Sequence, residues 1–195
     1  VKDKIKKLIK VKKFNDFVSL FNENNVVYDE ENVKIGLIPN DTDDFKSFTY
    51  VNGLKMKDGG IHVDVIINQV INIIRDKLSR KYKNLKPGDI KNKLTLIAFI
   101  KNFPNPKFNS QTKEKLTNSQ KEFNEFAQID YKFVDKLLKN PNFVDPIIEV
   151  YKIKEEYENR KALKSVEKTK KIKSDKYFRG TGSRKYLVLC EGFSA

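Results

Sequence analysis

The chain has 195 residues, of which 40 are Lys or Arg and 26 are Asp or Glu, so its formal net charge is +14. A single Cys excludes a disulfide framework and a cysteine-based zinc site, and a single His excludes a multi-histidine metal site. No apolar run approaches the length of a bilayer span. With 14 Phe and 8 Tyr in an apolar fraction of 38%, the chain has enough apolar side chains for one medium core.

The start of the chain indicates its context. It begins at Val1 rather than at a methionine, and no apolar signal segment is present. We therefore expect a fragment of a longer intracellular protein that has no membrane partner.

The positive charge is concentrated at the two ends. Residues 1–13 contain seven lysines against one aspartate, and residues 151–189 contain thirteen basic side chains against five acids. Residues 14–150 are almost neutral, with twenty basic and nineteen acidic side chains. This distribution indicates a polyanion near the ends, most often nucleic acid. An equally good interpretation is solvated surface in a chain that is generally rich in Lys, Asn and Ile.

The first quarter of the chain is expected to form one helix and two strands. Apolar side chains recur at helical spacing over 14–21, and the Asn, Asp and Glu of 22–32 predict a loop. Alternating polarity predicts strands at 33–38 and 45–51, with a turn between them that is rich in Pro, Asn and Asp. We expect these two strands to pair as a hairpin.

A long helix and a central strand are expected next. The glycines at 53, 59 and 60 indicate a loop whose backbone needs freedom, and an apolar stripe predicts a helix over 61–83. A Pro-Gly pair at 87–88 interrupts the helical pattern. Residues 94–103 are apolar enough for a central strand.

Further helices are expected in the next part of the chain. The pattern Ser119 to Glu122 is a capping box, and residues 131–139 have helical spacing. Asp145 is typical of an N-cap, with Pro146 at the first position of a long helix.

Residues 186–190 form a short apolar run that predicts a strand. The order of all these elements indicates an α/β domain followed by the start of a second domain.

The loop from Phe108 to Lys113 is the first candidate for chemistry. It follows a strand, where functional loops concentrate. A lysine on a stiff loop can contact a phosphate as a point charge, and a glutamine can bind an oxygen beside it. Taken alone, the pattern favours an ordinary loop.

Two other places have weaker signals. Glu191 follows an apolar strand and precedes Gly192, which suits magnesium binding through oxygen, although one carboxylate does not make a site. His62 follows the pair Gly59–Gly60. There the favoured interpretation is structural: a glycine turn, a helix start and a histidine with a local hydrogen bond.

Several runs taken together resemble the type IIA DNA topoisomerase family, on its ATPase (gyrase B-like) side. They correspond to the family patterns F-V-N with G-G-T-H-V-D, V-K-P-x-x-I-K-N, N-P-x-F-x-S-Q-T-K-E and E-G-D-S-A. A set of motifs in a fixed order is far more specific than any one of them. In this chain they are F-T-Y-V-N-G at 48–53 with K-D-G-G-I-H-V-D at 57–64, L-K-P to I-K-N at 85–92, N-P-K-F-N-S-Q-T-K-E at 105–114, and C-E-G-F-S-A at 190–195, with a weaker likeness of 11–21 to the eukaryotic and viral lead-in.

The resemblance implies an α/β fold with a defined domain order. A lead-in linker and short helix would occupy 1–30, and a transducer domain 31–145. The transducer would contain a left-handed βαβ crossover of the ribosomal-protein/GHMP-like kind, which is rare among such connections. A long connecting helix over 146–172 would then lead to 173–195, the first strand of a truncated Toprim fold.

The resemblance also implies roles for particular residues. Lys113 matches the lysine that reaches the ATP γ-phosphate, and Gln111 the glutamine beside it. Glu191 matches the Toprim glutamate, which ligates Mg²⁺ and is catalytic in DNA cleavage and religation. The implied cofactors are ATP and Mg²⁺. The basic stretch near the C-terminus would contact DNA through Lys168, Lys170, Lys171, Lys173, Lys176, Arg179, Arg184 and Lys185.

The implied function is that of a central fragment of an ATP-hydrolysing type II DNA topoisomerase, which couples ATP binding and hydrolysis to double-strand cleavage and passage. Its partners would be double-stranded DNA and a homodimeric or multi-subunit assembly. The location would be a host or bacterial cytoplasm, or the nucleus of a eukaryote. No ATPase phosphate-binding motif, attacking tyrosine or downstream aspartate pair is present in these residues. We therefore expect the fragment alone to be inactive.

One departure from the family pattern leaves alternatives open. Phe193 stands where the family has Asp, which, with the Lys, Asn and Ile bias, indicates a viral or phage lineage. Phe193 also favours a second interpretation, a non-catalytic nucleic-acid-binding scaffold of the same fold, against which Gln111, Lys113 and Glu191 count. A mismatch-repair protein of the GHKL class would share the architecture but would lack the Glu191–Gly192 ending.

Overall fold

The computed structural model of the chain describes residues 10–169, with the backbone alone at Tyr131 and at 166–169. The chain divides into two compact units, Val1–Lys154 and Glu155–Ala195, and each is described by itself. Nearly all of the described structure lies in the first unit. Within the described residues, no helix is long and apolar enough to cross a membrane.

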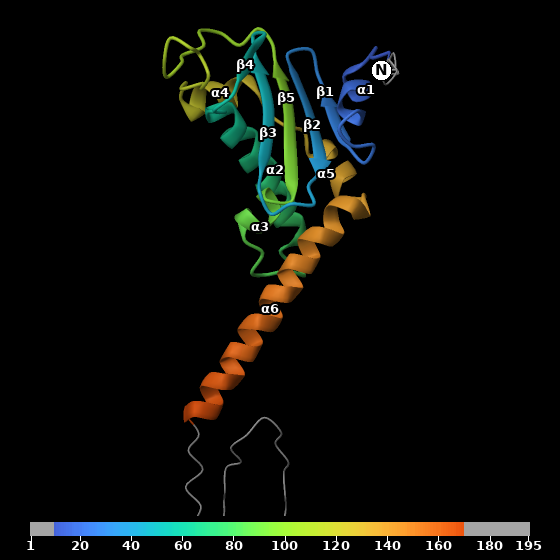
Figure 1. Cartoon of the computed structure of the whole chain (residues 1–195), viewed down its shortest axis with the longest axis vertical. Coiled ribbons are helices and arrows are strands. Elements are labelled where there is room, and N and C mark those ends of the chain that lie inside the picture. Colours follow the sequence, from blue (N-terminus) through green and yellow to red (C-terminus); the bar gives the residue numbers. More distant parts are fainter. Residues whose placement is uncertain (1–9, 170–195) are drawn as a thin grey trace, which may run out of the picture. The chain divides into compact units, whose positions relative to one another are not determined.

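The first unit is built on a five-stranded sheet (Figure 1). Its strands follow the order β1-β2-β5-β3-β4 across the sheet, and every neighbouring pair is antiparallel except β3 and β5, which are parallel. The mixed α/β fold predicted from the element order is therefore confirmed. The strand bounds are Val26–Asp29 (β1), Val33–Pro39 (β2), Lys46–Val51 (β3), Leu54–Met56 (β4) and Leu94–Ile100 (β5).

The predicted hairpin between 33–38 and 45–51 is wrong. The central strand β5 lies between β2 and β3 and pairs with both. Its residues are buried on both faces, with Phe99 alone half-buried, which is typical of a central strand. The connection at 40–45 passes the start of β5, where the Asn40 amide donates to the Lys93 carbonyl at 3.0 Å.

The predicted loop at 22–32 contains strand β1, which forms a hairpin with β2. The other hairpin of the sheet joins β3 to β4 around Asn52 and Gly53, which both have positive φ. Alternating polarity predicted the longer strands correctly. It missed β1, because a short edge strand among Asn and Glu residues has too weak a pattern.

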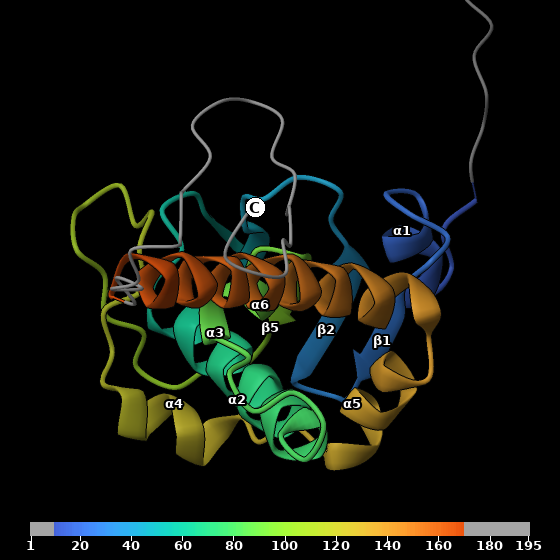
Figure 2. The ribbon, with the colours of Figure 1, turned by 90° about the horizontal axis from the view of Figure 1, so that it is seen from below.

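One face of the sheet carries the main core. Figure 2 shows α2 (Ile61–Leu78), α4 (Gln120–Phe126) and α5 (Tyr131–Leu138) on this side. The predicted helix at 61–83 begins at the expected residue but ends at Leu78, followed by a short helix α3 (Pro87–Lys91) within the predicted break. The last member of the predicted apolar stripe of α2, Leu78, is half-buried. The other six are buried, as the spacing predicted: Val63, Ile66, Ile67, Val70, Ile71 and Ile74.

A smaller core lies on the opposite face of the sheet. There α1 (Phe14–Ser19), within the predicted 14–21 helix, packs its Val18 against Gly36 of β2. A Cβ atom at Gly36 would lie 2.6 Å from the nearest Val18 methyl carbon, so only glycine allows this approach. The packing of α1 on the sheet therefore requires that residue 36 have no side chain.

The helices after β5 lie where the sequence predicted them, except that the last helix begins earlier. The Ser119–Glu122 capping box forms as predicted, and α5 matches 131–139 closely. The last helix, α6 (Pro141–Thr169), begins earlier than the predicted Asp145–Pro146 start and contains Pro146 in its interior. The same signal, an Asn or Asp before Pro, occurs at Asn140, whose side chain accepts the Asn142 amide at 3.1 Å. The predicted strand at 186–190 lies outside the described residues.

Candidate functional site

The first candidate loop forms a short β-like hairpin, residues 107–117, called here the Lys113 hairpin. The Thr117 amide donates to the Lys107 carbonyl at 2.8 Å, and the Asn109 amide donates to the Lys115 carbonyl at 3.2 Å. Phe108 and Leu116 face each other as an antiparallel bridge. The loop is therefore a defined structure with a base and a tip.

The tip of the hairpin presents the predicted phosphate-binding residues. The Lys113 amide donates to the Ser110 carbonyl at 3.1 Å, and the hydroxyls of Ser110 and Thr112 are hydrogen-bonded at 2.7 Å. Lys113 has a φ of 56°, in the left-handed region that side chains other than glycine rarely adopt. Gln111 and Lys113 are both exposed, so the turn holds a lysine and a glutamine close together and open to a ligand.

The base of the hairpin is attached to the start of α2. The Leu116 amide donates to the Gly59 carbonyl at 3.2 Å, and the Ile61 amide donates to the Leu116 carbonyl at 3.1 Å. Gly60 lies between them with a φ of 129°, and a Cβ there would lie 2.3 Å from the Leu116 carbonyl oxygen. Gly60 is thus required so that two backbones can meet.

A buried amide holds the two sides of the base together. Asn118 is 5% exposed, accepts the Lys107 amide at 2.7 Å and donates both to the Asn105 carbonyl and to Glu122, each at 3.1 Å. The Glu122 carboxylate also accepts the Ser119 amide at 2.9 Å. This amide, then Asn118 and Lys107, lowers the pKa of Glu122 to about 2.

A third attachment ties the loop to the end of β3. Asn52 donates to the Phe103 carbonyl and accepts the Phe103 amide, both at 2.9 Å. Because these bonds follow the strand directly, the polypeptide leaving β5 is held before it reaches the hairpin. The tip therefore rests on a base joined to both β3 and α2.

Lys113 contacts an aromatic ring and does not pair with the neighbouring carboxylate. The Lys113 ammonium lies 5.8 Å from the centre of the Phe108 ring, a cation–π arrangement. Its neighbour Glu114 instead pairs with Lys57, with 2.6 Å between Nζ and Oε1. This pairing lowers the pKa of the Glu114 carboxyl and raises that of the Lys57 ammonium. Among the described residues, none forms an ion pair with Lys113. The site can therefore offer one positive charge and a glutamine amide to an anion.

His62 has the structural role that its sequence context favoured. It is completely buried, and its Nε2 lies 2.7 Å from the Thr49 hydroxyl in a hydrogen bond. Its Nδ1 makes no hydrogen bond with the described residues. Burial lowers the pKa of His62 to about 4, so the imidazole is neutral near pH 7.

Replacing His62 with glutamine is expected to flatten the acid side of the stability profile. The folded-state pKa of about 4 lies below the ordinary value of 6.5, so the unfolded chain binds the proton more readily. The stability from the neutral imidazole is fully present above pH 6.5 and is lost as the pH falls toward 4, by about 1.4 kcal/mol per unit. Urea unfolding at pH 5 and pH 7 measures the change. Equal pH slopes for the wild type and the variant would contradict the assignment.

The sequence of the chain matches one known protein family. The sequence profile of the DNA gyrase B family matches residues 1–169. The chain belongs to the DNA gyrase B family. The predicted resemblance to the gyrase B-like side of the topoisomerases is thereby confirmed, and the motif at 190–195 lies outside the matched residues.

Curated relatives of this gyrase B family chain include two proteins named as DNA topoisomerases. DNA topoisomerase 2 of Candida glabrata is 34% identical over 161 residues, which cover 77% of this chain and 11% of that protein. The DNA topoisomerase large subunit of Enterobacteria phage T4 is 30% identical over 138 residues, covering 70% of this chain and 27% of that protein. The chain thus spans about a tenth to a quarter of the length of these relatives.

A solved structure has a similar fold. It is the crystal structure of the ATPase and transducer domains of DNA topoisomerase II from Balamuthia mandrillaris, with a TM-score of 0.67 and 24% identity. The match covers 73% of this chain and 37% of that one. This likeness supports the fold of the gyrase B family chain and extends no further.

The structure places only part of the predicted site. Gln111 and Lys113 come together at the hairpin tip, while Glu191 lies outside the described residues. Within the described residues, no group of three His, Cys, Asp or Glu side chains is arranged to bind a metal ion. Of the predicted DNA-binding set, Lys168 lies in α6 without a described side chain, and the others lie outside the described residues: Lys170, Lys171, Lys173, Lys176, Arg179, Arg184 and Lys185.

Sequence reasoning missed the contacts around Lys113. Phe108 was noticed only as the start of the candidate loop, and Glu114 and Lys57 only as letters of the family motifs. Nothing in the spacing indicated that Lys57 pairs with Glu114. A lysine and a glutamate 57 residues apart give no local signal. The two glycines before α2 were a partial signal, because they indicated a close backbone approach.

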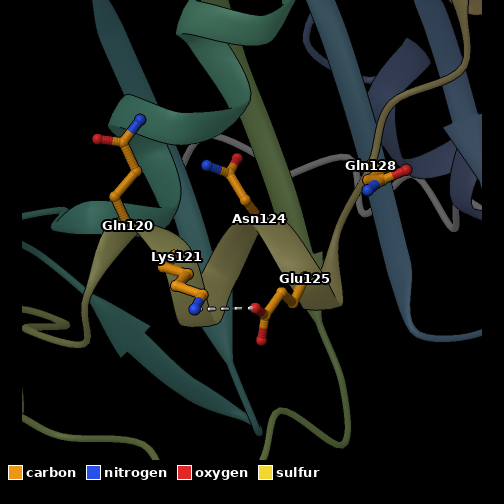
Figure 3. A pocket seen from close by; sticks show the side chains of 5 residues that line it. All are labelled: Gln120, Lys121, Asn124, Glu125 and Gln128. Atoms are coloured by element: carbon orange, nitrogen blue, oxygen red, sulfur yellow. Dashed lines mark ion pairs between the residues drawn. The ribbon is translucent and has the colours of Figure 1, made fainter.

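Surface depressions beside α4 do not coincide with the hairpin tip. One, of about 440 Å³, is lined by the polar side chains that Figure 3 shows. Its basic group Lys121 pairs with Glu125 at 4.0 Å, so its charge is already balanced. Another, of about 360 Å³, includes Phe103 and Asn118 at the base of the hairpin. The first is lined by Gln120, Lys121, Asn124, Glu125 and Gln128.

Proposed function

We propose that this chain is the central, coupling part of an ATP-dependent type II DNA topoisomerase. The observation that carries the proposal is the Lys113 hairpin: an exposed lysine at a firmly anchored tip, within the motif that resembles the family's phosphate-contacting loop. The relatives named DNA topoisomerase 2 support it, because the chain aligns with them over most of its own length.

In this proposal Lys113 contacts the γ-phosphate of ATP, and Gln111 binds an oxygen beside it. The nucleotide would be held by an ATPase domain elsewhere in the complete protein. Loss of the γ-phosphate removes the contact of Lys113, as in other nucleotide switches. Since the hairpin base is bonded to Gly59 and Ile61 at the start of α2, a displaced tip would move that helix.

The domain order implied by the resemblance belongs to the same proposal. Residues 31–145 act as the transducer, with a left-handed crossover from β3 through α2 to β5. The connecting helix, which begins at Pro141 rather than at residue 146, leads to the start of a Toprim fold at 173–195, where Glu191 binds Mg²⁺ and takes part in cleavage. The basic stretch Lys168–Lys185 lies along DNA, and its affinity falls steeply with salt. The complete protein works as a dimer or a multi-subunit assembly, and the Phe193 departure is explained by a viral or phage origin.

Relaxation of supercoiled plasmid by the complete protein tests the proposed function. We expect relaxation in steps of two linking numbers that requires ATP, because double-strand passage changes the linking number in pairs. DNA binding without any change in topology, at any ATP concentration, would overturn the proposal and favour the non-catalytic scaffold.

A further inference from the structure

The residue after Lys113 poses an electrostatic problem for a phosphate contact. Glu114 carries a negative charge next to the ammonium that must attract an anion. An unpaired carboxylate there would repel the phosphate and would also compete for the Lys113 ammonium. The structure has to neutralise Glu114 or direct it elsewhere.

Lys57 solves this problem from another part of the chain. It follows β4 directly, and its Nζ lies 2.6 Å from Glu114 Oε1. The backbone is tied at the same point, where the Asp58 amide donates to the Glu114 carbonyl at 3.1 Å. The Thr112 hydroxyl also contributes to the lowered pKa of the Glu114 carboxyl. Glu114 is therefore held toward β4 by a countercharge and by its own backbone.

The Lys113 side chain takes a different direction. Its ammonium lies over the Phe108 ring at 5.8 Å from the centre, and its backbone has the left-handed φ of 56°. An aromatic face attracts an ammonium more weakly than a carboxylate does, so a phosphate can displace it. The hairpin thus holds Lys113 near the Phe108 ring, which a phosphate can replace, while Lys57 pairs with the Glu114 carboxylate.

We propose that Lys57 is a positioning residue for Lys113: it holds the Glu114 carboxylate neutralised and turned away, so that the Lys113 ammonium is available to the terminal phosphate of a nucleotide. The inference rests on the proposed function of Lys113. A purely structural role explains less, because the Lys57 side chain is 65% exposed and surface ion pairs contribute little to folding.

Steady-state ATP hydrolysis by the complete protein tests the inference with four variants. We expect Lys57→Met to raise KM for ATP about fivefold and to change kcat by less than about twofold, since one uncompensated charge acts on binding. Glu114→Gln should lower KM slightly. The KM of the double variant should lie within about twofold of the KM of Glu114→Gln. The increase in KM caused by Lys57→Met should become smaller at high salt. Lys55→Met, which removes a nearby exposed lysine of β4, is the matched control and should leave KM near the wild-type value.

Two results would overturn the positioning role. One is a wild-type KM in Lys57→Met, and the other is a double variant as impaired as Lys57→Met alone, which would indicate general damage to the hairpin. Lys113→Ala, measured beside them, separates this failure from failure of the proposed function. If Lys113→Ala is impaired and Lys57→Met is not, only the positioning inference is wrong. If Lys113→Ala turns over ATP normally, the proposed function itself is wrong.

A titration that needs no nucleotide completes the test. In the 195-residue chain, the Glu114 carboxyl followed by carbon NMR should titrate at a higher pH in Lys57→Met than in the wild type, since its countercharge is gone. An unchanged Glu114 titration would show that the ion pair does not form in solution and would overturn the inference by itself.

Discussion

Replacing Lys113 with alanine is expected to lower ATP turnover by the complete protein about 100-fold, as does loss of one preorganised charge stabiliser in other enzymes. Strand passage should fall with it, while DNA affinity stays within about twofold, because the hairpin tip is not part of the predicted DNA-binding stretch. The variant tests the side chain cleanly. Lysine and alanine both carry a Cβ, so the strain of the left-handed backbone at 56° is unchanged. Coupled ATPase and plasmid relaxation assays measure the effect.

Lys115→Ala is the matched control for Lys113→Ala. Lys115 is an exposed lysine on the same hairpin, and its described hydrogen bond to Asn109 uses only the backbone carbonyl. We expect ATP turnover within about twofold of the wild type, since its ammonium is not at the tip. Equal losses in both variants would mean that general positive charge, rather than a specific phosphate contact, explains the result. Wild-type turnover in Lys113→Ala would disprove the proposed function.

Replacing Gly60 with alanine is expected to lower the free energy of unfolding by about 3 kcal/mol, a typical cost of strain combined with overpacking. The new Cβ would lie 2.3 Å from the Leu116 carbonyl oxygen and 2.6 Å from its amide nitrogen. These are backbone atoms, which cannot rotate away, so the hairpin must separate from the start of α2. Urea unfolding measures the loss of stability. Hydrogen exchange at the Leu116 and Ile61 amides should become faster, because their bonds hold this junction.

Gly53→Ala separates the two contributions to that loss. Gly53 also has a positive φ, 83°, but an added Cβ would meet no atom within 4 Å. We expect a cost of about 1 kcal/mol from backbone strain alone. If Gly53→Ala and Gly60→Ala cost the same, the close approach to Leu116 does not hold the hairpin, and the coupling between the Lys113 tip and α2 loses its structural basis.

Features that depend on neighbouring residues were predicted well. The α2 stripe, the buried run of β5 and the Ser119–Glu122 capping box all appear as expected. Each is a periodicity or a short-range hydrogen-bond pattern, so the required information lies within a few residues. The start of α6 shows the limit of such signals. Two such pairs, Asn140–Pro141 and Asp145–Pro146, lie near its start, and the helix begins at the first of them.

Features that depend on distant residues were missed or mistaken. The sequence could not show that β5 inserts between β2 and β3, because adjacent strands pair as hairpins by default and the exception is decided by burial across the whole sheet. The strand β1 was missed for a related reason, since its pairing with β2 compensates for a weak local pattern.

The ordered motifs were sufficient to indicate the family of this chain and to single out Gln111 and Lys113 as candidates for a phosphate contact, because such motifs preserve residue type and spacing. What surrounds these two residues became known only from the three-dimensional structure. In the structure Leu116 pairs with Gly60, and the Lys113 ammonium lies over the Phe108 ring. Glu114 pairs with Lys57, although α2 and β5 separate these two residues in the sequence. Such contacts form only when segments far apart in the sequence fold together. They are stabilised by packing and charge between those segments, which no local sequence pattern reveals.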